Sequence, residues 1–273
     1  MGLRPLFFIG VIMAQTVVPP NFYYNIATQN QKDPSDIHKF GRANVSTTYV
    51  PIALGNTYQT PQVGSETQLR IAAGDANDAP AGTGARKIYL EGLNASGELI
   101  TDEIETNGIS AGTASTESFL RLFRFYVSES GTYATSSAGS HAADIVIENS
   151  AGGTTWGTID SSGFPRGQSE VAAYSVPLGY KAYIQNIFIS VQDTKTVSVL
   201  GFQRNGILKT SAPYDAMRSF VDLGTIQGEE FLTPKTPIGP FNELTDLGFM
   251  GRLETGGGTA EIDIDMEIIL DQV

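Results

Sequence analysis

The segment from Ala260 to Leu270 constrains the fold of this chain more than any other, because it alternates strictly in polarity. Apolar side chains take every second position and acidic side chains take the positions between them. Successive side chains of a β-strand point to opposite faces of a sheet, so this pattern predicts a strand with one face in a core and the other in water. The apolar set is Ile262, Ile264, Met266 and Ile268, and the acidic set, called the acidic row below, is Glu261, Asp263, Asp265 and Glu267.

Similar period-two segments recur from Asn44 onward, separated by short stretches rich in glycine, serine and threonine. The 273 residues include 30 glycines and 13 prolines and are only 17% charged, which is typical of short strands joined by tight turns. Asn94 to Gly97 is one such turn and is expected to close a hairpin. Little helix is expected. The predicted strands are 67–72, 86–93, 98–104, 119–127, 143–148, 154–160, 170–177, 180–191, 196–202, 218–223, 229–232, 247–253 and 260–270.

These strands suffice for an all-β fold with two antiparallel β-sandwich domains. We predict an extended N-terminal arm over residues 1–42, a first sandwich over residues 43–165 and a second, jelly-roll-like sandwich over residues 166–273. The arm is expected because residues 15–41 are polar and rich in proline, asparagine and glutamine, without sustained periodicity. A segment with so little core of its own is ordered only along a neighbouring surface.

Charge and composition argue against several classes of function. A formal net charge of -12 and a pI of about 4.6 leave no broad basic surface for phosphates, so direct nucleic-acid binding is not expected. No apolar run approaches the roughly 20 residues of a membrane helix, so no membrane partner is expected. The absence of cysteine excludes disulfides and thiolate metal sites. Residues 1–14 fit either a short signal peptide or a retained apolar extension.

Motifs of catalytic or cofactor chemistry are not found, so we expect a protein that is not an enzyme and has no cofactor and no metal. The histidines, His38 and His141, have no catalytic signature around them. Residues 82–87 differ from a phosphate loop in their glycine spacing and lead into a strand. Residues 75–78 offer oxygen ligands but lack the rest of a calcium loop, which favours a turn.

Two sets of residues are candidates for partner binding. The acidic row could hold a cation or meet a basic partner, although a solvated strand face that resists aggregation has the same pattern. The arm is the second candidate, because aromatic side chains provide large contact areas in interfaces. Its candidate anchors are Phe22, Tyr23, Tyr24, His38, Lys39 and Phe40.

Six short segments occur in a fixed order between residues 21 and 191: Ile37–Arg42, Ala81–Arg86, Ile88–Leu93, Ser118–Arg121, Tyr174–Pro177 and Lys181–Ile184. In this order they resemble a family of virion structural proteins of tailed bacteriophages, particularly marine ones. The segments consist of common strand and turn residues, so the resemblance carries over no catalytic residue.

The resemblance implies a component of a virus particle. The leading expectation is a capsid decoration or cement-type protein on the particle surface, which binds capsid or other virion proteins and forms a closed homo-oligomer such as a trimer. The alternative is a fibre or receptor-binding adhesin that recognises host surface glycan through the loops 131–141 and 152–163. A glycan-degrading enzyme would need a pair of carboxylates that the sequence does not single out, although Trp156 could stack on a sugar.

Overall fold

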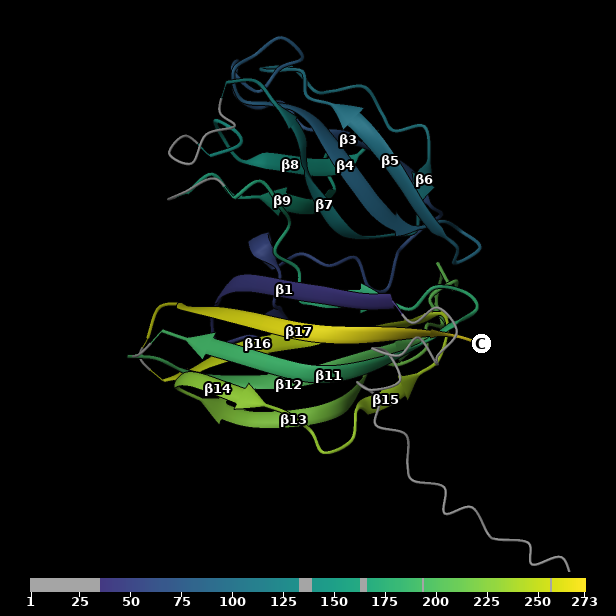
Figure 1. Cartoon of the computed structure of the whole chain (residues 1–273), viewed down its shortest axis with the longest axis vertical. Coiled ribbons are helices and arrows are strands. Elements are labelled where there is room, and N and C mark those ends of the chain that lie inside the picture. The colour runs from purple at the N-terminus through teal and green to yellow at the C-terminus, as the bar shows by residue number, and fades with distance from the viewer. Residues whose placement is uncertain (1–34, 133–138, 163–165, 193, 256) are drawn as a thin grey trace, which may run out of the picture.

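The computed structural model describes residues 35–132, 139–162, 166–192, 194–255 and 257–273 (Figure 1). The all-β prediction is confirmed, since the chain forms antiparallel sheets stacked into two sandwiches. Within the described ranges, the only helical element is the 3₁₀ turn η1 (Leu54–Asn56). No helix in this part of the chain has the length and apolar character needed to cross a membrane.

The blue-to-teal upper part of Figure 1, built from β3 to β9, is called the insert sandwich here. The predicted hairpin is present in it: Gly97 has a φ of +79°, and the Asn94 side chain accepts hydrogen bonds from the amides of Ser96 (2.9 Å) and Glu98 (3.0 Å). One sheet has the order β6-β3-β8-β9, with β3 Thr67–Ile71, β6 Ser118–Phe119, β8 Ile145–Asn149 and β9 Thr155–Ile159. The other has the order β5-β4-β7, with β4 Ala85–Leu93, β5 Leu99–Glu105 and β7 Arg121–Ser130.

The remaining strands form the lower part of Figure 1, called the base sandwich. Its two sheets are named by their central strands. The β17 sheet has the order β1-β17-β11-β14, with β15 also paired to β11; the strands are β1 Ser35–Val45, β17 Ala260–Gln272, β11 Tyr180–Val191, β14 Gly228–Leu232 and β15 Ile238–Phe241. The β16 sheet has the order β10-β16-β12-β13, with β2 also paired to β16; the strands are β10 Ala173–Ser175, β16 Thr245–Thr255, β12 Thr196–Asn205, β13 Arg218–Ile226 and β2 Val50–Pro51.

The structure differs from the predicted arm at residues 35–42, which belong to β1. This strand pairs with β17 along its whole length, from Ser35 opposite Leu270 to Val45 opposite Ala260. Its core-facing positions include Lys39 and Gly41, so the apolar alternation that indicates a strand is weak. Gly41 is required for close packing, because a Cβ there would lie 2.2 Å from the amide nitrogen of Ala172. Residues 1–34, with Phe22, Tyr23 and Tyr24, lie outside the described residues.

The arrangement of the two sandwiches also differs from the predicted boundaries. The strands β1 and β2 join the base sandwich, and the insert sandwich is placed between β2 and β10 in the chain (Figure 1). Residues 43–51, predicted to begin the first sandwich, therefore belong to the second. The reason is the pairing of Val50 and Pro51 with β16, some two hundred residues further along, which no local pattern encodes.

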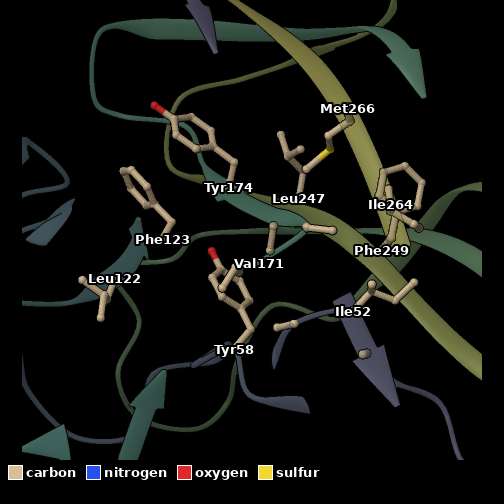
Figure 2. Close-up of a cluster of buried hydrophobic side chains, with 14 of the residues drawn as sticks. Ile52, Tyr58, Leu122, Phe123, Val171, Tyr174, Leu247, Phe249, Ile264 and Met266 are labelled. Carbon is tan, nitrogen blue, oxygen red and sulfur yellow. The ribbon is translucent and has the colours of Figure 1, made fainter. Parts of the chain in front are cut away.

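The predicted core face of β17 is confirmed, because Ile262, Ile264, Met266 and Ile268 are all buried. Figure 2 shows Ile264 and Met266 beside Leu247 and Phe249 of β16. These contacts form the core between the two sheets of the base sandwich. The same apolar cluster continues into the insert sandwich, where the ring of Phe123 lies 4.6 Å from that of Tyr174 between centroids. One continuous core therefore joins the two sandwiches.

A buried polar network crosses the same junction. Arg121 at the start of β7 and Asp246 on β16 are 1% and 0% exposed. The guanidinium donates from Nε to both carboxylate oxygens at 3.0 Å and from Nη2 to Oδ2 at 2.8 Å. Ser175 Oγ donates to the same carboxylate at 2.6 Å, and Tyr58 Oη donates to it at 3.3 Å. These residues, called the junction network, fix the insert sandwich to the base sandwich through charge-assisted bonds.

Candidate functional site

The solvent-facing side of the β17 sheet, called the outer face, brings two predicted sets of residues together. His38 and Phe40 of β1 lie opposite Glu267 and Asp265 of β17, so part of the predicted arm borders the acidic row. Side chains alternate along a strand, so the residues between the buried isoleucines of β17 point outward, together with the residues paired to them on the neighbouring strands. The outward positions on the four strands are His38, Phe40, Arg42 and Asn44; Glu261, Asp263, Asp265 and Glu267; Asn186, Phe188 and Ser190; and Glu229 and Phe231.

Three phenylalanines cross the outer face in one row. The register places Phe40 and Phe188 on either side of Asp265, with Phe231 next to Phe188. Phe231 is 64% exposed, which is unusual for a large aromatic side chain on a strand. No local pattern indicates a site at Phe188 and Phe231, because only the register of strands far apart in the chain places them beside Phe40.

Cations compensate the acidic row only in part. Nε2 of His38 contacts the Asp265 carboxylate. Arg42 points instead toward Asp160 (2.7 Å) and Glu170 (2.8 Å) at the edge of the sheet. Burial, and then the charge of neighbouring Glu261, raises the pKa of Asp263 above its usual value. The carboxylates of the row therefore repel one another, and a cationic partner would relieve that repulsion.

Shallow hollows follow the outer face along β17. The largest, about 450 Å³, lies beside Glu261 and Asp263, and a second of about 230 Å³ lies between Phe40 and Phe188. A third of about 110 Å³ lies between His38 and Phe231. Among the described residues, no group of three or more histidine, aspartate or glutamate side chains is placed to hold a metal ion.

Lys39 lies on the other side of β1 from His38 and Phe40. It is 5% exposed at the junction of the sandwiches, where its ammonium group donates a hydrogen bond to the carbonyl of Phe123 and lies 6.0 Å from that ring. Burial lowers its pKa to about 7, an effect that Glu91 opposes and Arg124 reinforces. The structure thus places Lys39 in a cleft between the sandwiches, away from the outer face.

The position of Lys39 predicts a pH dependence of stability. Its pKa is about 7 in the folded protein and near 10.4 in an unfolded chain, so between these values the unfolded state binds more protons. The free energy of unfolding is therefore expected to rise as the pH increases from 7 to about 10. Urea denaturation at several pH values measures this rise. In Lys39→Met the free energy of unfolding should rise less over this pH range than in the unmodified protein. An equal rise in the variant and the unmodified protein would contradict the prediction.

The remaining candidates from the sequence have structural roles. His141 is buried, with Nδ1 2.8 Å from Ser140 Oγ and Nε2 3.1 Å from the Asp160 carbonyl, and burial lowers its pKa. Residues 75–78 form the expected turn, in which the Asp78 amide donates to the Asp75 carbonyl at 3.0 Å. The Asp78 carboxylate accepts hydrogen bonds from the amides of Ala85, Ala142 and Ala143. Trp156 is 3% exposed and belongs to the core, where it offers no open ring face for a sugar.

Comparisons with known proteins give no family. No family model matches the chain, and no curated protein matches it. A structure of the Gt strain of infectious bursal disease virus matches with a TM-score of 0.24 and 10% identity, covering 88% of this chain and 73% of that chain. The VP2 subviral particle of the same virus matches with a TM-score of 0.22 and 8% identity, covering 88% of this chain and 72% of that chain. With TM-scores below 0.5, these likenesses assign neither a fold family nor a function to this chain.

Proposed function

We propose that this protein is a structural component of a bacteriophage virion, a capsid decoration or cement-type protein that acts through contacts between subunits. The observation that carries the proposal is the outer face, where an aromatic row and partly compensated carboxylates lie on a sheet held in place by a continuous core. Aromatic anchors within a polar surround are characteristic of protein interfaces. The ordered segments that resemble phage virion proteins support the same assignment, and Ile37–Arg42 among them lies in β1.

We further propose that the outer face binds a basic segment of a capsid or other virion protein. Pairing of two copies through this face would bring like charges together, which costs several kcal/mol. A basic partner would instead neutralise the acidic row while its apolar groups cover Phe231. On this proposal the subunits of the expected closed homo-oligomer, such as a trimer, contact one another through surfaces other than the outer face. The protein would lie on the particle surface and have no catalytic activity.

The first test is incorporation into particles. Phe231→Ala is expected to weaken attachment by about tenfold or more, because truncation of an aromatic hot-spot residue costs about 2 kcal/mol or more. Binding of the purified variant to particles that lack the protein would measure this. Leu99→Ala is the matched control, since Leu99 is 51% exposed on β5 of the insert sandwich. Equal attachment of both variants and the unmodified protein would reject the outer face as the interface.

A second test concerns the arm. Removal of residues 1–34 takes away the candidate anchors Phe22, Tyr23 and Tyr24 but leaves β1 in place. We expect this truncation to reduce attachment to particles while the sandwiches stay folded. Undiminished incorporation would reject the arm as an anchor, and labelling of intact virions would locate the protein on the head or the tail.

The alternative is a fibre or an adhesin that recognises host glycan. Its predicted binding loops are 131–141 and 152–163, of which residues 133–138 and 163 lie outside the described residues and residues 155–159 form β9. Saturable binding of the isolated protein to host polysaccharide, with no binding to particles that lack the protein, would favour this alternative.

A further inference from the structure

A cleft of about 430 Å³ separates the first half of β1 from the insert sandwich. One wall comes from the base sandwich, with residues 36–40 of β1 and Tyr174 of β10. The other wall comes from Glu91 of β4 and residues 123–125 of β7, and Gln168 and Ser169 line the cleft as well. Its volume lies in the range of small-molecule sites, which commonly form between domains.

The unexpected residue in this cleft is Lys39. A methionine or leucine would fill the same space without the cost of desolvating an amine, so stability does not explain a lysine there. The ammonium group has three donors, and among the described residues its one hydrogen-bond acceptor is the Phe123 carbonyl. Donors therefore remain for a group that enters the cleft.

The other lining side chains define what that group can be. Arg124 and Glu91 form a loose ion pair at 3.9 Å, and His38 contacts the Asp265 carboxylate, so these side chains have partners of their own. Asp36 is more easily protonated than usual, because burial and the charge of Glu267 raise its pKa. The protonated amine of Lys39 is then the charge in greatest need of a counter-ion. The Gln168 amide and the Tyr174 hydroxyl, both in the lining, can add neutral donors.

We propose that the cleft binds a carboxylate group, with the Lys39 ammonium as its counter-ion. The carboxylate belongs to a small organic acid or to the C-terminus of a partner chain. This site borders the outer face, with which it shares His38 and Phe40, but its argument does not depend on the proposed function.

The proposal has a directional pH dependence. A carboxylate stays ionised well below pH 6, whereas the Lys39 amine gains its proton as the pH falls through about 7. The affinity for a carboxylate is therefore expected to increase from pH 8 to pH 6, and bound carboxylate should raise the pKa of Lys39. Glu91 and Arg124 are the charged groups that act on the amine, and Asp36, His38 and Tyr174 are the other titratable groups in the lining. Their contribution should persist in a Lys39 variant.

The experiment is a titration of the full-length protein, carrying isotope-labelled lysine side chains, with acetate at pH 6 and pH 8. Saturable shifts of the Lys39 signal with acetate, stronger at pH 6, are expected, and acetamide, its neutral isostere, should cause none. Lys39→Met should weaken acetate binding, followed by calorimetry, about tenfold or more, because a hydrogen bond to a charged group is lost. A short peptide with a free C-terminus, compared with its amidated form, distinguishes a partner chain from a small acid.

Lys87→Met is the matched control, because Lys87 lies half-exposed on β4, away from the cleft, and pairs with Glu103 (3.3 Å) and Glu129 (3.4 Å). It should bind acetate like the unmodified protein. Near-UV circular dichroism verifies that both variants are folded. Should Lys39→Met fail to fold, the lysine signals of the unmodified protein decide the matter. No saturable shift, an affinity equal at the two pH values or equal binding by folded Lys39→Met would overturn the proposal.

Discussion

Replacement of Asp246 by alanine is expected to lower the free energy of unfolding by about 3–5 kcal/mol, because Arg121 would stay buried without its counter-ion. Both side chains are almost completely inaccessible to water. Ser175 and Tyr58 would also lose the carboxylate to which they donate. Urea denaturation at pH 7 measures the loss. Because the network spans both sandwiches, their unfolding transitions should also separate in this variant.

The control for this prediction is an exposed ion pair. Glu103→Ala removes a partner of Lys87 at the surface and should change the free energy of unfolding by less than about 1 kcal/mol. A double replacement, Arg121→Met with Asp246→Leu, should recover much of the stability, since apolar residues of similar volume often replace a buried pair without loss. A loss for Asp246→Ala as small as that for Glu103→Ala would contradict the prediction.

Removal of residues 1–42 is expected to abolish the cooperative unfolding transition, whereas removal of residues 1–34 should preserve it. The longer truncation deletes most of β1 and leaves one edge of β17 without its partner. The lost strand is expected to cost most of a stability that is about 5–15 kcal/mol for a typical domain. Thermal unfolding followed by near-UV circular dichroism compares the two truncated proteins.

A point variant tests whether the loss of stability comes from β1 itself and not from the number of residues removed. Gly41→Val places a side chain against the Ala172 amide and the Ile52 carbonyl, so β1 could not dock. Asn44→Val, on the exposed side of the same strand, has ample space and should unfold like the original protein. Normal stability of Gly41→Val would mean that β1 is dispensable, and the truncation of residues 1–42 would then test only the arm.

Local alternation predicted most strands of the fold, because a strand with one buried face carries its own signal. The acidic row and the isoleucines of β17 are the clearest case, and the turn at Asn94 to Gly97 was predicted from its own side chains. β1 was not predicted, because Lys39 and Gly41 face inward and its inward positions therefore lack the apolar side chains that indicate a buried face.

The candidate sites were less predictable, because they depend on pairings between distant segments. Neither the position of Phe231 beside Phe188 nor that of Lys39 beneath Phe123 follows from any local pattern. Arg121 is a charged residue in the core, and its ion pair with Asp246 offsets the cost of removing its charge from water. Trp156 was considered for sugar stacking, yet strand alternation turns it inward.

The pairing of β1 with β17 sets an order on the synthesis of this protein. The insert sandwich uses one continuous stretch, from β3 to β9, and can fold while the rest of the chain is still being made. The base sandwich cannot close at that time, since β1 has to wait until β17 leaves the ribosome. Contacts so distant in sequence form slowly. During that interval the backbone groups of β1 are unpaired and can pair with another chain. The yield of folded protein is therefore expected to depend on how well this edge is shielded in the nascent chain.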